Sequence, residues 1–132
     1  MKEPYWISRI ECLALHDMML GNYGGAEGVR DEGLLESALA RPQQAFAYGN
    51  PTMLDLAAAY AGGVVKNHPF IDGNKRTGFM LAAGFLERNG YEFTASEADA
   101  ALRTLALAAG EMTETGYAAW LEANCKKPKK RR

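Results

Sequence analysis

The sequence predicts an all-α protein of about six helices in a compact single domain. Its 132 residues suit one domain that can bury a sizeable core. Apolar residues recur at helical spacing along most of the chain, and capping residues precede most of these stretches. Strand signals are nearly absent, since no run alternates β-branched and polar residues between turn residues.

The first helix is expected from about residue 9 to residue 20. Ser8 and Glu11 form an S-x-x-E capping box at its start. The glycine-rich stretch NYGGAEGVR (22–30) follows and is interpreted as a turn. It has neither the GK[ST] ending of a phosphate-binding P-loop nor the spacing of GxGxxG.

Asp31 is expected to cap a second helix, EGLLESALAR, which Pro42 should stop. Residues 42–51 would then form a connection. Thr52 caps a third helix, which should end near Asn67 because the following X-Pro step disfavours helical geometry.

The fourth helix is expected to start around residues 73–74 and to stop at an Asn-Gly pair. YEFTA then forms a short extended link. Ser96 caps a fifth helix that Gly110 breaks, and a last helix covers roughly residues 113–124, with Trp120 and Leu121 facing inward.

Composition indicates a soluble, cytoplasmic protein with no membrane partner. It is 48% hydrophobic and 23% charged, and no apolar run approaches the roughly 20 residues that span a bilayer. The start, MKEPYWISRIE, has no apolar core of a secretory signal. The two cysteines, Cys12 and Cys125, form no CxxC pair and are interpreted as free thiols.

The charge is divided unevenly between the domain, residues 1–125, and a basic tail, residues 126–132. The tail, KKPKKRR, holds six of the 15 cations, whereas all 16 acids precede it. Such a tail can bind nucleic acid. A solvated, disordered end is favoured instead, because the rest of the chain has no basic stripe to continue it.

The stretch NHPFIDGNKRTG (67–78) gathers polar groups between two apolar helices. His68 follows the third helix, and histidine is the side chain that most often serves as a general base. Phe70 is the residue expected to anchor the loop in the core. Asp72 can orient a hydroxyl, bind Mg²⁺ or carry a proton.

Gly73 and Asn74 begin the fourth helix, whose first N–H groups have no partners within the helix. These groups and the helix dipole form a natural phosphate cradle, which Gly73 leaves accessible. Lys75 and Arg76 stand in the first turn, where the dipole disfavours cations. A bound phosphate would reverse that penalty, and guanidinium binds phosphate in a bidentate manner.

A polar interhelical turn explains any one of these residues alone. Together they supply a base, a carboxylate and an anion cradle, which favours transfer of a phosphorus-containing group to a hydroxyl. His16, inside the first helix, is interpreted as structural, because two histidines make a histidine metal site improbable.

The segment HPFIDGNKR resembles the signature HxFx[DN]x[GA]N[GK]R of the Fic/Doc family, and in particular its death-on-curing (Doc) branch. LALHDMMLGNYGG, VRDEGLLESALARP and FLERNGYEF also resemble Doc-branch segments. The resemblance runs from about Ile7 to Trp120 and implies the all-helical Fic fold.

By position, the resemblance implies that His68 is the base and Phe70 the buried anchor. It implies that Asp72 organises Mg²⁺ or the reacting groups. Gly73, Asn74, Lys75 and Arg76 would form the nest that holds ATP.

Two departures from Fic adenylyltransferases, which read HPFxxGNGRxxR, point away from AMP transfer. Lys75 replaces a glycine of their nest, and Phe79 stands at their second arginine. The Doc branch shares the lysine, which implies γ-phosphoryl transfer from ATP, a kinase reaction, to a threonine of elongation factor Tu and inhibition of translation. Gly73 instead matches the adenylyltransferase pattern, where Doc has alanine. AMP transfer and a non-catalytic binding module are the alternatives.

The self-inhibitory pattern [ST]xxxE[GN] is absent from the sequence. Inhibition would then come from a separate chain, as the resemblance to a toxin of a toxin–antitoxin pair implies. The antitoxin would be a disordered segment that folds into a groove. Phe46 and Tyr48 are candidates for that groove or for target docking, with ordinary core aromatics as the alternative.

Overall fold

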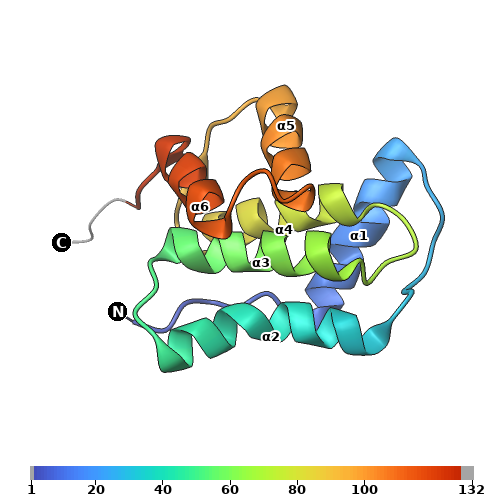
Figure 1. Ribbon diagram of the computed structural model, residues 1–132, viewed down its shortest axis with the longest axis horizontal. Coiled ribbons are helices and arrows are strands. Elements are labelled where there is room, and N and C mark those ends of the chain that lie inside the picture. The colour runs from blue at the N-terminus through green and yellow to red at the C-terminus, as the bar shows by residue number, and fades with distance from the viewer. Residues whose placement is uncertain (1, 129–132) are drawn as a thin grey trace.

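The computed structural model describes residues 2–128, and the regular elements of this part are helices apart from one two-residue strand pair (Figure 1). This confirms the predicted all-α class. The elements, in chain order, are α1 (Arg9–Tyr23), α2 (Glu32–Tyr48), α3 (Met53–Asn67), α4 (Asn74–Arg88), β1 (Glu92–Phe93), α5 (Glu97–Ala108), α6 (Glu114–Ala123) and β2 (Cys125–Lys126).

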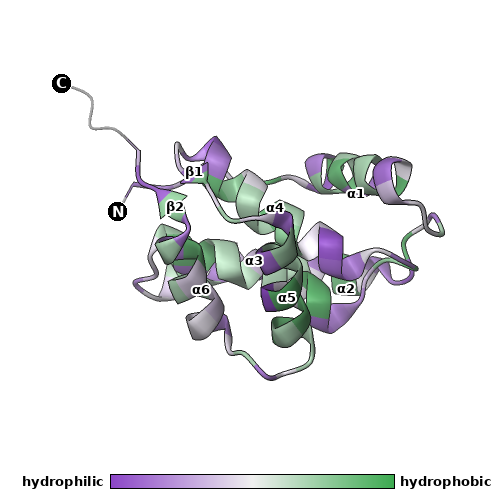
Figure 2. Cartoon of the chain, turned by 90° about the horizontal axis from the view of Figure 1, so that it is seen from above, coloured by the Kyte–Doolittle hydropathy of each residue, from purple (hydrophilic) through white to green (hydrophobic). Residues whose placement is uncertain are grey.

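Helix α3 forms the centre of the fold, with α2, α4 and α6 packed against it (Figure 1). Eleven of its 15 residues are buried, and Figure 2 shows hydrophobic residues on α3 and on the neighbouring α5 and α6. A side chain on Gly63 would meet the backbone and Cβ of Ala38 in α2, with the nearest atoms at 3.1 Å. Small residues therefore allow α2 to approach α3 closely.

Two helix ends differ from the sequence prediction. Pro42 does not stop α2, which continues to Tyr48 with Pro42 buried inside it. The proline costs one helical hydrogen bond, but the close contact of Ala38 with α3 and the contact of Phe46 with Trp6 hold both halves of the helix in place. Phe46 and Tyr48 therefore lie on a helix and not on a connection.

Helix α1 also runs past its predicted end at residue 20, to Tyr23. Gly24 ends it, with a φ of 79° and its N–H donating to the Leu20 carbonyl. Glycine adopts this positive φ without the penalty of a Cβ. Tyr23 is consequently fixed on a helix and not in the predicted turn.

The other predicted starts and stops are confirmed. The Ser8–Glu11 capping box is present, and Thr52 and Ser96 cap α3 and α5. The extended link becomes β1, whose Glu92 and Phe93 pair with Lys126 and Cys125 of β2 in an antiparallel arrangement. The first residue of the predicted tail is thus paired, and residues 129–132 lie outside the described part.

Burial in this core affects two ionisable side chains, Tyr60 and Cys12. The Tyr60 hydroxyl accepts a hydrogen bond from the Ile7 N–H at 3.0 Å, and burial raises the pKa of Tyr60 to about 12. Cys12 is buried and its thiol pKa is likewise raised to about 12, which keeps it protonated and unreactive at neutral pH.

No helix within residues 2–128 has the length and apolar character needed to cross a membrane.

Candidate active site

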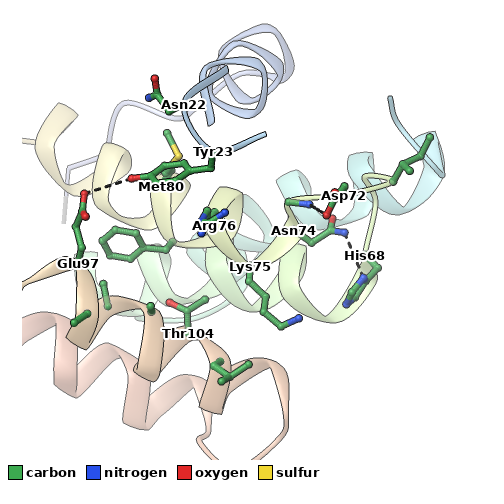
Figure 3. A pocket seen from close by; sticks show the side chains of 17 residues that line it. Asn22, Tyr23, His68, Asp72, Asn74, Lys75, Arg76, Met80, Glu97 and Thr104 are labelled. Carbon is green, nitrogen blue, oxygen red and sulfur yellow. Dashed lines mark hydrogen bonds between the residues drawn. The ribbon is translucent and has the colours of Figure 1, made fainter. Parts of the chain in front are cut away.

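An open cleft of about 910 Å³ lies between the end of α1, the first two turns of α4 and one side of α5 (Figure 3). Six of the seven predicted site residues line it, namely His68, Asp72, Gly73, Asn74, Lys75 and Arg76. Apolar side chains continue the cleft beyond the polar end, among them Phe79, Met80 and Leu105. A polar, partly cationic end therefore adjoins an apolar one.

The start of α4 is built differently from every other helix start within residues 2–128. The other five helices have a side-chain N-cap, from Ser8, Asp31, Thr52, Ser96 or Thr113, and an acidic residue in the first turn. Helix α4 begins after Gly73 with no side-chain cap and no first-turn acid. The residues of this start, Gly73 to Arg76, line the cleft, and an uncapped helix start with two cations favours an anion there.

Asn74 holds the loop before α4, residues 68–73, which we call the active-site loop. Its Oδ1 accepts the Phe70 N–H and its Nδ2 donates to the Phe70 carbonyl, both at 3.0 Å. The same Nδ2 lies 3.3 Å from Nδ1 of His68. The buried Asn74 amide thus holds the backbone of the loop at Phe70 and contacts the His68 imidazole.

His68 ends α3 in the left-handed conformation, with φ 50° and ψ 55°. Among residues 2–128 it is the one non-glycine residue with positive φ. For a residue with a Cβ this conformation costs energy, so surrounding contacts must impose it. The turn exposes His68 at one end of the cleft (Figure 3).

Phe70 belongs to the active-site loop but does not line the cleft, because its side chain is buried in the core, 1% exposed. Its ring stacks on the His16 imidazole, with the centroids 3.8 Å apart. Nε2 of His16 lies 2.8 Å from the Asp72 carbonyl and donates to it, because a carbonyl can only accept. His16 is therefore structural, and its structural task is to support the active-site loop from α1.

The Asp72 carboxylate is engaged by backbone groups. Its Oδ1 accepts the Gly73 N–H at 2.8 Å and its Oδ2 accepts the Ala26 N–H at 3.2 Å. Residues 2–128 contain no group of three or more His, Cys, Asp or Glu side chains that could hold a metal by themselves. One carboxylate with spare lone pairs fits a Mg²⁺ ion that takes its other ligands from phosphate and water.

The backbone conformation and the packing at Gly73 also favour glycine, beside the access for an anion that the sequence predicts. Its φ of 81° is left-handed, and a Cβ there would collide with the terminal methyl group of the buried Met19. Both facts favour glycine at this position. The structure therefore adds two reasons for glycine to the access for an anion, which stays a prediction.

Arg76 lies over the ring of Tyr23, with its guanidinium carbon 4.2 Å from the ring centroid. The Tyr23 hydroxyl lies 3.4 Å from Oε1 of Glu97 on α5, at the end of the cleft away from His68 (Figure 3). Sequence reasoning missed Tyr23, because it placed residues 22–30 in a turn. A cation–π contact of this kind orients the guanidinium while leaving its N–H groups free for an anion.

The active-site loop is also fastened from outside by residues 28–31. The Gly28 carbonyl accepts the Ile71 N–H, and the N–H groups of Arg30 and Asp31 donate to the Pro69 carbonyl. No local pattern in the sequence signals these contacts. Together with His16 and Asn74 they fix the backbone that presents His68 and Asp72.

The protein is thus a helical domain with an uncapped, cationic helix start beside an exposed histidine. A model of the Fic/DOC family matches residues 6–86, more than half of the chain. Protein kinase doc of Escherichia phage P1 is 37% identical over 113 residues, which cover 85% of this chain and 89% of the phage protein. Toxin Doc of Mycolicibacterium smegmatis is 46% identical over 76 residues, 55% of this chain and 58% of that protein. The chain belongs to the Fic/DOC family.

Proposed function

We propose that this protein is a Doc-like toxin that transfers the γ-phosphate of ATP to a hydroxyl of a target protein. The proposed target is a threonine of elongation factor Tu, and the consequence is inhibition of translation in the cytoplasm. One observation carries the proposal. The start of α4 lacks the cap and acid of the other described helices and has Lys75 and Arg76 beside His68 in one cleft.

In this reaction His68 takes the proton of the target hydroxyl as its oxygen attacks the γ-phosphorus. The bond from the γ-phosphorus to the bridging oxygen breaks, and ADP leaves with the electron pair. The first N–H groups of α4, with Lys75 and Arg76, neutralise charge on the phosphate oxygens. Asp72 would hold Mg²⁺, which supplies further positive charge at the phosphates when bound.

Two residues support phosphate over AMP as the transferred group. Lys75 fills a position that adenylyltransferases of the family keep as glycine. Phe79, at the position of their second arginine, packs against Phe93 and Trp120, with ring centroids 5.3 and 6.5 Å away. A phosphate ligand is thus replaced by a member of an aromatic cluster. The name of the phage relative, a protein kinase, agrees with this choice.

We also propose a cognate antitoxin, since both relatives are Doc proteins and one is named a toxin. Of the two aromatic candidates for its docking, Phe46 packs edge-on against Trp6 and belongs to the fold. Tyr48 is 91% exposed and is the one free for contact with a partner. A non-catalytic binding module is the second class of function, which a labelling experiment must exclude.

Purified protein with Mg²⁺ and elongation factor Tu tests the reaction. Label from γ-labelled ATP should appear on the factor, and mass spectrometry should find a phosphate on a threonine. His68→Ala should abolish both. Label arriving only from α-labelled ATP would show AMP transfer instead. Growth arrest that persists in His68→Ala, without labelling of any protein, would show a binding module.

A further inference from the structure

Arg30 lies between α1 and α2, outside the cleft lining, yet its side chain ends on the active-site loop. Its Nε donates to the His68 carbonyl at 2.7 Å, and its Nη2 donates to the Asn67 carbonyl at 2.9 Å. Its own N–H donates to the Pro69 carbonyl at 2.7 Å. One residue therefore binds three consecutive carbonyl groups at the end of α3.

This end of α3 needs an external donor. The last carbonyl groups of a helix have no partners within it, and a left-handed terminal residue is often followed by an N–H that folds back onto them. Here the residue after His68 is Pro69, which has no N–H. The His68 N–H reaches the Val64 carbonyl at 3.1 Å, but the Asn67 and His68 carbonyls point to Arg30.

Arginine suits this task for two reasons. Its planar guanidinium offers several N–H groups in a fixed arrangement, so two adjacent carbonyls can be bound at once. Its positive charge also lies at the negative end of the α3 dipole. These bonds hold the two peptide groups on either side of the His68 Cα, and thereby its left-handed φ and ψ.

We infer that Arg30 is a positioning residue: it fixes the His68 backbone in the conformation that presents the imidazole to the cleft. It does so without contact to the nucleotide, because it is absent from the residues that line the cleft. The inference rests on the proposed role of His68 as base. It predicts an effect on turnover and not on nucleotide affinity.

The test compares Arg30→Ala and Arg30→Lys with wild type. Arg30→Ala should lower kcat by about 10- to 100-fold, because displacing a reacting group by about 1 Å costs that much. KM for ATP should change by less than about twofold. Arg30→Lys keeps the positive charge but loses the planar set of N–H donors. Its kcat should therefore fall between those of wild type and Arg30→Ala. Arg9→Ala is the control, since Arg9 is another exposed arginine that pairs with Glu32, away from the cleft.

A second readout needs no reaction. The NMR chemical shifts of His68 Cα and of its carbonyl carbon report a left-handed backbone, and they should move in Arg30→Ala but not in Arg9→Ala. Thermal melts of each variant establish that it is folded. If wild-type protein transfers no phosphate, the proposed function fails while these shifts still decide the role of Arg30.

Equal kcat for Arg30→Ala and Arg9→Ala, with unmoved His68 shifts, would overturn the inference. So would a raised KM for ATP at unchanged kcat, which would make Arg30 a nucleotide-binding residue. If Arg30→Ala does not fold, Arg30→Lys decides: kcat and His68 shifts equal to those of wild type would overturn the inference as well.

Discussion

Helices α3 and α4 have 15 residues each and pack against one another, yet they begin in opposite ways. At the start of α3, Thr52 and Asp55 form a complete capping box, with bonds of 3.1 and 2.9 Å. At the start of α4 there is a left-handed glycine, no side-chain cap, and Lys75 and Arg76 in the first turn.

The difference separates two uses of the same backbone feature. A capped start satisfies its N–H groups within the protein and adds stability. An uncapped start with cations lacks that stability, but its N–H groups and its positive charge remain available to bind an anionic ligand. Because the other described helix starts resemble that of α3, the exception at α4 is not a general property of this fold, and it supports the proposed site.

The largest expected effect comes from giving α4 the kind of start that α3 has. Lys75→Glu should weaken ATP binding on the order of 100-fold, because it removes one phosphate contact and adds repulsion. The free energy of unfolding should stay equal or rise by about 0.3–1 kcal/mol, since an acid suits the helix dipole. Isothermal titration calorimetry and urea unfolding measure the two quantities.

Asp55→Lys at the start of α3 is the mirror-image control. It should lower stability by about 1 kcal/mol or more, through loss of the capping box and an unfavourable charge, and leave ATP binding unchanged. Should Lys75→Glu bind ATP as wild type does, the start of α4 would not be the nucleotide site.

Bound ATP should stabilise the start of α4, because its phosphates would supply the negative charge and the hydrogen-bond acceptors that this helix start lacks. ATP at about 100 times its dissociation constant should stabilise the folded protein by about 2.7 kcal/mol. The rise in melting temperature, followed by calorimetry with increasing ATP, should be largely lost in Lys75→Glu and retained in Asp55→Lys. A rise of equal size in both variants would place ATP elsewhere.

The two helix starts also show what a sequence can reveal about this molecule. Caps are local, so the starts at Thr52 and Ser96 are predicted from a few neighbouring residues and confirmed. The proposed anion cradle is equally local, because residues 72–76 are contiguous. Their place in one cleft could therefore be predicted from the sequence alone.

What depends on distant contacts could not be predicted. The rule that proline ends a helix failed at Pro42, because close contact of Ala38 with Gly63 supports α2. Arg30 meets the His68 carbonyl across 38 positions of sequence, and His16 meets the Asp72 carbonyl across 56. No periodicity links such residues, so only the fold shows that they support the active-site loop.

A smaller effect is expected from the backbone at Gly73, where α4 starts left-handed while Thr52 starts α3 in an extended conformation. Gly73→Ala should lower the free energy of unfolding by about 1–2 kcal/mol, because of the positive φ and contact with Met19. Urea unfolding measures it. Gly21→Ala is a matched control of opposite sign: Gly21 lies inside α1 with open space at its Cβ, so alanine should stabilise by about 0.5–1 kcal/mol. Equal stability of the two variants would mean that Gly73 is under no strain.

The smallest effect is expected from removing only the cap of α3. Thr52→Ala deletes the oxygen that accepts the Asp55 N–H and should cost about 1 kcal/mol of unfolding free energy. Thr52→Ser keeps that oxygen and should cost much less. Urea unfolding of both variants measures the difference, and ATP affinity should be the same in each, because Thr52 does not line the cleft. A change in ATP affinity on loss of this cap would mean that the starts of α3 and α4 are coupled. In that case it would be wrong to assign the start of α3 to stability alone and the start of α4 to binding alone.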